Sequence, residues 1–328
     1  MAMSANQQRL IGLLADGELH SGETLGQKLG ISRAAVWKAI QKLADYGLSV
    51  QQRTGSGYWL ATPMELLEEN RIRADLSETA GERLALEVVS SCDSTNAVLR
   101  SAELPAAPRY RALLSEHQGA GRGRHGRVWR SGFGEGVYLS LGQELGGGLE
   151  RLASLSLVIG IGACRALTKL GIDGVGLKWP NDLWVDGQKL GGILLEADGE
   201  IAGSCRWVAG LGLNWHLQGE VSIDQAWTDL QRLSAGDPPS RNALCGQLLE
   251  QLIEVCDQFR EEGFAPFGGE WEALDVLAGR AVTVTIGNRS FDGVAAGLSP
   301  GGELNVEVGN ETLRVASGEV SVRPSATA

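Results

Sequence analysis

The sequence contains no segment that is long and apolar enough to cross a membrane. No stretch without a charged residue exceeds 13 residues, the length of 152–164, whereas a membrane-spanning helix needs about 20. The segment 152–164 therefore predicts a buried helix. The chain also lacks a basic start followed by an apolar core and a cleavage site, so we expect neither secretion nor a membrane partner.

Cysteine is scarce as well. The five cysteines are odd in number and show no Cys-x-x-Cys spacing, so neither a disulfide framework nor a zinc site is indicated. A cytoplasmic protein is the expectation that fits this pattern. The cysteines are Cys92, Cys164, Cys205, Cys245 and Cys256.

Basic side chains are outnumbered by acidic ones, 29 to 40, which gives a net charge of −11. This charge argues against non-specific nucleic-acid binding by the whole molecule. The charge is uneven, however, because residues 1–62 carry a net charge of +2 and the remainder −13. With 328 residues, the chain is longer than a domain with a single hydrophobic core usually is, so we expect two or three domains. The positive net charge of residues 1–62 is compatible with DNA binding by the first of them.

The first 62 residues have the pattern of three short helices followed by a hairpin. Apolar residues at 10–14 begin an amphipathic helix. Ser21 and Ser32 are typical N-caps for two more helices, and Gly30 between them is typical of a helix end. The segments 48–53 and 58–61 flank a glycine-rich turn and predict two paired strands. Together these elements predict a winged helix-turn-helix.

The third helix presents a polar face opposite its apolar one, which suits insertion into a DNA major groove. A helical interaction module without a DNA role is the alternative, since short amphipathic helices are common. The tight turn, the donor-rich face and the wing occur together, and this combination favours DNA binding. The predicted DNA-binding residues are Ser32, Arg33, Ala34, Trp37, Lys38 and Gln41.

The segment 121–126 matches the G-x-G-x-x-G pattern of dinucleotide-binding folds but lacks the required context. That pattern must follow a strand and open a helix, whereas here the segment 110–116 precedes it and strand-like residues at 128–130 and 137–141 follow. The loop therefore joins two strands. Its glycines alternate with arginines, which predicts a site for a carboxylate or phosphate. A solvated hairpin with incidental arginines is the alternative.

Three more polar clusters adjoin short apolar runs, at 93–96, 178–182 and 189–196. The first offers short donors and acceptors for a polar head group, although the same residues also cap helices. The second combines a lysine with amide and carboxylate oxygens, which suits a nucleotide phosphate and its Mg²⁺, or a simple turn. The third begins with Lys189. Its ammonium could act as a point charge on a transferring phosphoryl group, or the side chain could be a solvated lysine at the edge of the sheet.

The order and spacing of five motifs resemble those of the biotin protein ligases. With the winged helix in front, the chain is similar to the bifunctional members that also repress the biotin operon, and the resemblance runs from about residue 10 to residue 323. The motifs are those at 93–96, 118–127, 178–182, 189–194 and 210–214.

The resemblance implies that ATP and biotin form biotinyl-5′-AMP, and that a lysine of the biotin carboxyl carrier protein of acetyl-CoA carboxylase then receives biotin. ATP acts with Mg²⁺, and no tightly bound cofactor is expected. The adenylate would also serve as corepressor for a ligand-induced homodimer on operator DNA.

Site residues are implied motif by motif. The catalytic residues are Lys189, Arg122 and Arg124. The biotin-binding residues are Ser94, Thr95, Asn96, Gln118, Arg122, Gly123, Arg124 and Lys189. The nucleotide-binding residues are Gly121, Arg127, Lys178, Asn181, Asp182 and Asn214, of which Asn181 and Asp182 are also the candidate metal ligands. The segment 215–237, where the family has an adenine-covering loop, diverges and contributes no residue.

The expected fold class is α+β with several domains. Residues 1–63 form the winged helix-turn-helix, 64–274 a central α/β ligase-like domain with a mixed sheet, and 275–328 a small SH3-like β-barrel. Strands are expected at 282–286, 290–294, 304–308 and 320–322.

Two other functions are compatible with parts of the pattern. A repressor that senses biotin without catalysis would not need the 178–182 motif or Lys189. A lipoate or octanoate ligase would share the fold, but Arg122–Arg124 beside Ser94 and Thr95 favours biotin.

Overall fold

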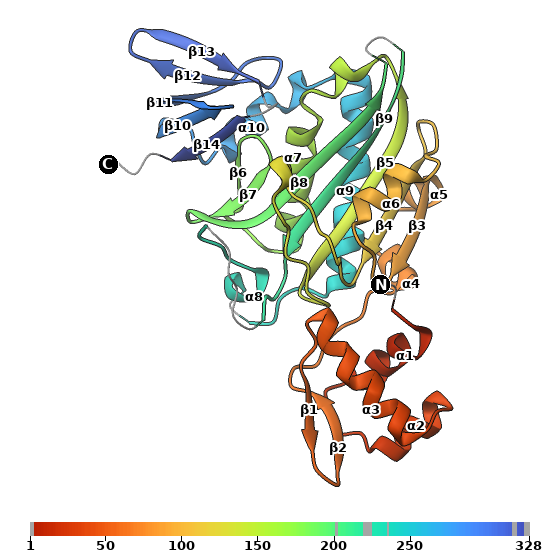
Figure 1. The fold of residues 1–328 in the computed structure, drawn as a ribbon. Coiled ribbons are helices and arrows are strands. Elements are labelled where there is room, and N and C mark those ends of the chain that lie inside the picture. The colour runs from red at the N-terminus through yellow and green to blue at the C-terminus, as the bar shows by residue number, and fades with distance from the viewer. Residues whose placement is uncertain (1–2, 201–202, 219–224, 235, 317–319, 325–328) are drawn as a thin grey trace.

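The computed structural model describes residues 3–200, 203–218, 225–234, 236–316 and 320–324. Figure 1 shows a central sheet with helices on both faces, the N-terminal module at one end of it and a small β-sheet at the other. Within these described ranges, no helix is long and apolar enough to cross a membrane.

The N-terminal module is the predicted winged helix-turn-helix. The side chain of Ser21 accepts a hydrogen bond from the Thr24 amide, and that of Ser32 accepts one from the Ala35 amide. Gly30 ends the second helix at φ +69°, a conformation that favours glycine. The elements are α1 (Ala5–Leu14), α2 (Gly22–Leu29), α3 (Arg33–Gln41), the 3-10 helix η1 (Lys42–Tyr46), β1 (Val50–Arg53) and β2 (Gly57–Leu60).

The central sheet has seven strands in the order β3-β4-β5-β9-β8-β7-β6. Only β3 and β4 run parallel, so the predicted mixed sheet is confirmed. The strands are β3 (Leu84–Val89), β4 (Tyr110–Ser115), β5 (Gly136–Gly146), β6 (Gly176–Lys178), β7 (Asp182–Val185), β8 (Gln188–Gly199) and β9 (Ser204–Asn214).

Helices cover both faces of this sheet. The buried helix expected at 152–164 is α7 (Leu155–Lys169), which packs against α9 (Arg241–Glu262) on one face. On the other face, α6 (Thr95–Ser101) contacts β4, β5 and β9. The shorter helices are α4 (Glu69–Arg73), α5 (Glu78–Arg83), η2 (Arg124–Gly126), η3 (Leu149–Leu152), α8 (Leu230–Leu233), η4 (Ala265–Phe267) and α10 (Gly268–Leu274).

The C-terminal part is an antiparallel sheet of five strands in the order β13-β12-β11-β10-β14. The sequence pattern missed β13, because four of its five residues are exposed and the alternation of apolar and polar residues is lost. The strands are β10 (Ala281–Ile286), β11 (Arg289–Leu298), β12 (Leu304–Val308), β13 (Glu311–Val315) and β14 (Val320–Pro324).

The strand expected at 128–130 is wrong. Val128 makes only an isolated bridge to Arg122, and β5 begins at Gly136. Val128 is 85% exposed, so its apolar side chain signals no buried strand here. The glycine-arginine segment therefore belongs to one long loop, 116–135, between β4 and β5.

A buried ion pair fixes the connection between the N-terminal module and the central sheet. Arg241 at the start of α9 is fully buried, and its Nη2 lies 2.8 Å from Glu116 Oε2 at the base of the 116–135 loop. The other Glu116 oxygen accepts the Leu67 amide, while Arg241 Nη1 donates to the Glu65 carbonyl at 2.8 Å. The connecting segment 65–67 is thus held by both partners of the pair.

The same loop also touches the N-terminal module directly. Phe133 is buried in the hydrophobic core of that module, and its amide donates to the Tyr46 carbonyl at 3.2 Å. The Tyr46 ring meets the His117 ring edge-on with centroids 5.2 Å apart. The loop is therefore in direct contact with the end of η1.

Candidate functional site

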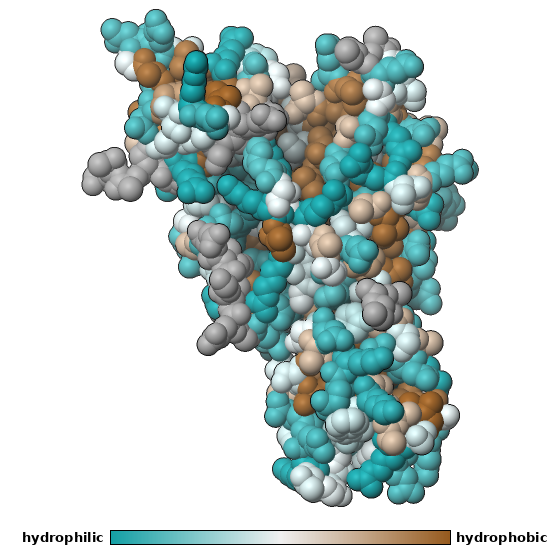
Figure 2. Space-filling model, viewed as in Figure 1, coloured by the Kyte–Doolittle hydropathy of each residue, from teal (hydrophilic) through white to brown (hydrophobic). Residues whose placement is uncertain are grey.

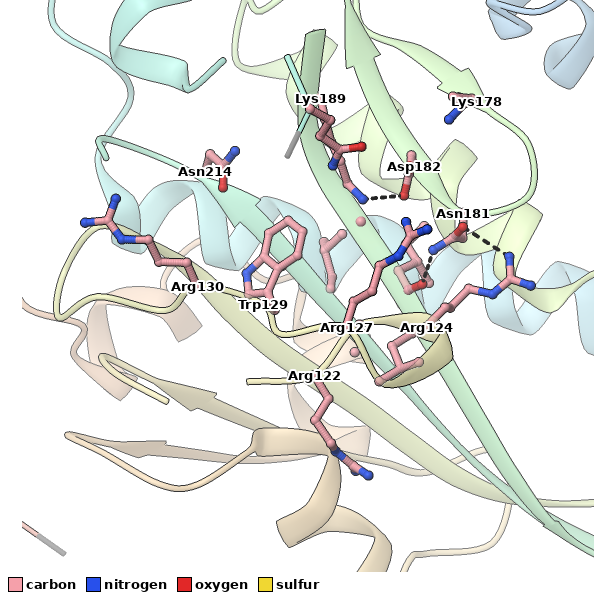
Figure 3. Close-up of a pocket in the computed structure, with 18 of the residues that line it drawn as sticks. Arg122, Arg124, Arg127, Trp129, Arg130, Lys178, Asn181, Asp182, Lys189 and Asn214 are labelled. Atoms are coloured by element: carbon pink, nitrogen blue, oxygen red, sulfur yellow. Dashed lines mark hydrogen bonds and ion pairs between the residues drawn. The ribbon is translucent and has the colours of Figure 1, made fainter. Parts of the chain in front are cut away.

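A cavity of about 1030 Å³ lies where the 116–135 loop, the β6–β7 hairpin, β8, β9 and the C-terminal sheet meet (Figure 3). Figure 2 shows that hydrophilic residues predominate on the face between the C-terminal sheet and the central sheet. Of the fourteen residues assigned to biotin and nucleotide from the sequence, thirteen line this cavity: Ser94, Thr95, Asn96, Gln118, Arg122, Gly123, Arg124, Arg127, Lys178, Asn181, Asp182, Lys189 and Asn214.

Gly121 does not line the cavity. It is buried, and its backbone packs against Trp129 and Ser131 so closely that a Cβ would lie 2.6 Å from Ser131 Oγ. A glycine is therefore needed at position 121 because a larger side chain would clash at the base of the loop.

Two glycines of β9 allow neighbouring side chains to pack directly against the sheet beside the cavity. A Cβ on Gly210 would collide with the side-chain amide of Asn96, and one on Gly212 would lie 2.5 Å from Trp129 Cε2. The 210–214 motif thus lets α6 and the Trp129 indole approach the floor formed by β9.

The 93–96 motif forms a hydrogen-bonded network at one end of the cavity. Ser94 caps α6, as the sequence allowed. Gln118 Oε1 accepts from the Thr95 amide at 2.9 Å, and Ser140 Oγ lies 2.7 Å from Thr95 Oγ1 and 2.6 Å from Asn96 Oδ1. Sequence reasoning missed Ser140, because it sits among apolar residues of β5 and nothing local marks it.

Lys189 and Asp182 form an ion pair at the centre of the cavity. Lys189 Nζ lies 2.8 Å from Asp182 Oδ1 and 5.5 Å from the centroid of the Trp129 ring. The hairpin of β7 and β8 places the two side chains on one face of the sheet, because Lys189 pairs with Trp184, two residues after Asp182. Figure 3 shows both side chains directed toward each other.

Lys178 lies beside this pair, at the end of β6. Its Nζ is 4.6 Å from the centroid of the Trp184 ring. Burial lowers the pKa of the Lys178 ammonium, Asp182 opposes this, and the nearby cations, Lys189 among them, lower it further. An anion bound here would relieve the repulsion among these cations.

Arg124 reaches the same region from the loop. Its Nη1 donates to Asn181 Oδ1 at 3.3 Å, and Asn181 Nδ2 donates to the Ile193 carbonyl at 2.8 Å. Burial lowers the pKa of the Arg124 guanidinium. Arg127 is exposed at the rim. Arg122, in contrast, lies 3.1 Å from Glu196 and is directed away from Lys189 and Asp182 (Figure 3).

The electrostatic character of the cavity is strongly positive, although the chain as a whole is acidic. Its described lining holds eight Lys and Arg side chains and a single carboxylate, Asp182. Oriented cations in a cleft concentrate and hold anions. Lining residues that the sequence pattern did not assign include Arg130 in the loop, Trp184 on β7, and, from more distant segments, Trp227, Arg280 and Arg323.

Trp227 belongs to the segment 215–237, in which the resemblance implied a loop over adenine. The described part of this segment runs beside β8, where the Lys189 amide donates to the Ala226 carbonyl at 3.0 Å. Arg232 stacks on Trp227 with its Cζ 3.8 Å from the ring centroid. Residues 219–224 and 235 lie outside the described residues.

The candidate metal ligands, Asn181 and Asp182, both have side-chain partners in the structure. In the part of the chain that the structure describes, no three His, Cys, Asp or Glu side chains are grouped to hold a metal. Asp182 already pairs with Lys189, and Asn181 Oδ1 accepts from Arg124. Mg²⁺ commonly needs only one or two carboxylates when substrate phosphates complete its shell.

All six predicted DNA-binding residues are solvent-exposed on α3 or at its N-cap. Trp37 is 48% exposed, whereas Val36 and Ile40 on the same helix are buried in the core of the module. Trp37 therefore belongs to the exposed face of α3, together with Arg33, Lys38 and Gln41.

Three family models match the chain. The biotin/lipoate A/B protein ligase family matches residues 88–214, an HTH domain matches 6–59, and the biotin protein ligase C terminal domain matches 278–323.

Similar proteins match nearly the whole chain. The bifunctional ligase/repressor BirA of Salmonella typhimurium is 41% identical over 318 residues, which is 96% of both chains, and that of Escherichia coli is 40% identical over 319 residues, again 96% of both. Among solved structures, the biotin protein ligase from Aquifex aeolicus in complex with biotin and ATP aligns with a TM-score of 0.63 at 28% identity, covering 74% of this chain and 99% of that one. The predicted family and fold class are thereby confirmed, and the chain belongs to the biotin protein ligases, in the bifunctional ligase/repressor form with an N-terminal HTH domain.

Proposed function

We propose that the cavity joins biotin to AMP and passes the biotinyl group to a lysine of the biotin carboxyl carrier protein of acetyl-CoA carboxylase. One observation carries this proposal: eight cationic side chains and a single carboxylate line the described part of a cavity large enough for a nucleotide and a small acid. The family membership supplies the substrates. We assign biotin to the end at Ser94–Asn96 and Gln118, and the nucleotide to the side of Lys178, Asn181, Asp182 and Asn214.

In the first step, a carboxylate oxygen of biotin attacks the α-phosphorus of ATP and pyrophosphate leaves. Both reactants are anionic, so their approach needs cations near the reacting oxygens. Lys189 lies at the centre of the cavity with Arg124 opposite it across Asp182 and Asn181. We assign Lys189 to the charge that develops on the carboxylate and phosphate oxygens, and Arg122 and Arg124 to holding the product phosphate.

In the second step, the neutral ε-amine of the carrier lysine attacks the acyl carbon, and AMP leaves with the bond electrons. The amine loses its proton to water or to the departing phosphate. No side-chain nucleophile is required in either step, which agrees with a lining of arginine, lysine, glycine and tryptophan. Mg²⁺, when bound with ATP, supplies further charge neutralisation.

We infer that the N-terminal module binds operator DNA as part of a ligand-induced homodimer in the cytoplasm, with biotinyl-5′-AMP as corepressor. The contacts of Phe133 with the module support this link, because they belong to the loop that lines the cavity. We also propose domain boundaries at 63/64 and 274/275. The first adjoins the clamped segment 65–67 and the second precedes β10.

Replacing Lys38 by alanine is expected to weaken operator binding about tenfold at moderate salt, because it removes one exposed cation from the face of α3. The slope of log affinity against log salt should fall by about one. Fluorescence anisotropy with labelled operator DNA at several salt concentrations measures both. Arg9→Ala is the control, since Arg9 lies on α1 and donates to the Lys28 carbonyl; an equal loss there would contradict the placement of DNA on α3.

The ligase proposal is tested by the exchange of labelled pyrophosphate into ATP, measured in the presence of different carboxylic acid substrates. Purified protein is incubated with MgATP and biotin, lipoate or octanoate in separate reactions. Exchange in the biotin reaction, but not in the lipoate or octanoate reaction, supports the proposal. Exchange only with lipoate or octanoate would assign the cavity to those acids, and no exchange with any of them would leave a non-catalytic sensor.

A further inference from the structure

Arg122, assigned above to the ligand anion, does not face the other cations of the cavity. Figure 3 shows its guanidinium directed away from Lys189 and Asp182. Its Nη2 lies 3.1 Å from Glu196 Oε2, on β8. To reach an anion held between Lys189 and Arg124, Arg122 has to leave this carboxylate.

Glu196 is the centre of a larger network. Its carboxylate also accepts Arg100 Nη1 at 2.8 Å and Asn96 Nδ2 at 3.0 Å, so it links the biotin end of the cavity to α6. Arg100 Nη2 in turn lies 2.9 Å from Asp198 Oδ1. Asp198 follows Glu196 by two residues on β8, so both carboxylates are on the same face of the strand. The positive charges of Arg122 and Arg100 are thus neutralised by the carboxylates of Glu196 and Asp198 on β8.

This arrangement makes the pair between Arg122 and Glu196 easy to open. When Arg122 leaves, Glu196 keeps Arg100 and Asn96 as partners, so no partly buried carboxylate is stranded. The Arg122 side chain is 43% exposed, so water solvates the released guanidinium. Opening the pair therefore costs little free energy, because neither charged group is left both buried and without a partner.

We propose that Glu196 is a substitute counter-ion for Arg122 in the empty enzyme and competes with the biotin carboxylate, and later with the adenylate phosphate, for its guanidinium. The pair holds the 116–135 loop against β8 and α6 until an anion takes Arg122 over. Glu196 is therefore a positioning residue that sets ligand affinity through Arg122. This inference rests on the proposed function for the identity of the anion.

Glu196→Gln tests the competition, because it removes the charge but keeps an oxygen that accepts from Asn96. Biotin binding measured by titration calorimetry without ATP should tighten about two- to fivefold, the equivalent of an exposed ion pair. In the empty protein, trypsin should cut the 122–127 segment faster, because the loop has lost its anchor. In the biotin-saturated protein, the cleavage rates of variant and wild type should agree.

Two controls separate this mechanism from a general charge effect. Asp198→Asn removes a carboxylate that pairs with Arg100 and, among the described residues, makes no bond to Arg122; its biotin affinity should stay at the wild-type value. In an Arg122→Gln background, Glu196→Gln should no longer tighten binding.

Weaker biotin binding in Glu196→Gln would show that Glu196 orients Arg122 for the ligand, and would overturn the competition. An equal gain in Asp198→Asn, or in the Arg122→Gln background, would also overturn it. If wild-type protein bound no biotin, the ligase proposal would fall, while faster trypsin cleavage of empty Glu196→Gln would still support the anchoring of the loop by Glu196.

Discussion

Lys189→Gln is expected to lower the rate of biotinyl-adenylate formation by about two to three orders of magnitude, the usual cost of removing a donor from a site of developing negative charge. Lys189 Nζ lies in the middle of the cationic cavity, 2.8 Å from Asp182 and over the Trp129 ring. Negative charge grows on the oxygens at phosphorus and on the departing pyrophosphate as the new bond forms, so loss of the Lys189 ammonium affects the chemical step most. Single-turnover rates with saturating biotin and MgATP measure the effect.

Asp182→Asn is the matched control for this variant. It breaks the same ion pair from the other side but leaves the ammonium in the cavity. If Lys189 acts as a charge on the reacting oxygens, Asp182→Asn retains more of the rate than Lys189→Gln. Equal losses would contradict an effect of the Lys189 charge beyond the ion pair and the assigned role of Asp182 in nucleotide binding. The Lys189→Gln variant should biotinylate the carrier protein faster when biotinyl-5′-AMP is supplied than when biotin and ATP are supplied.

Arg241→Met is expected to destabilise the protein by about 3–5 kcal/mol, because it leaves the Glu116 carboxylate buried without its cation. Both side chains of this pair are almost completely buried, 0% and 5% exposed. The pair also holds the connecting segment, through the Leu67 amide on Glu116 and the Glu65 carbonyl on Arg241. Urea unfolding followed by tryptophan fluorescence measures the loss.

The double variant Arg241→Met/Glu116→Gln distinguishes the charge from the packing. The introduced glutamine side chain still accepts the Leu67 amide but carries no charge, so most of the stability lost in Arg241→Met should return. The single variant Glu116→Gln, which leaves the buried arginine without a carboxylate, should be destabilised as well. Stability that stays low in the double variant would assign the loss to packing around Arg241 instead.

Local signals were sufficient to predict the winged helix. Ser21, Gly30 and Ser32 each act within four residues along the chain, so caps and a helix end are visible in the sequence. The glycine-arginine loop could be singled out as a candidate anion site for a similar reason, since alternating glycine and arginine need no distant partner to suggest that use. The expected strand at 128–130 failed because an apolar side chain there stays in solvent.

The rest of the site depends on residues that come together only through the register of the sheet. Ser140 lies beneath Thr95 because β5 pairs with β4 and β9 in a fixed register, and no pattern near residue 140 shows this. Glu196 lay within a motif that the sequence singled out, but its pairing with Arg122 requires the loop to fold over β8. Arg280 and Arg323 enter the cavity from the C-terminal sheet.

The formation of biotinyl-5′-AMP and the delivery of biotin to a carrier lysine by one cavity can be followed in a single experiment. Purified protein is incubated with biotin and α-labelled MgATP, free nucleotide is removed, and a carrier fragment whose mass is followed is then added. We expect at most one retained biotinyl-5′-AMP per chain, and its discharge as AMP together with the mass increase of one biotinyl group on the carrier. A labelled adenylate that never forms, or a carrier whose mass does not change when it is added, would contradict this expectation.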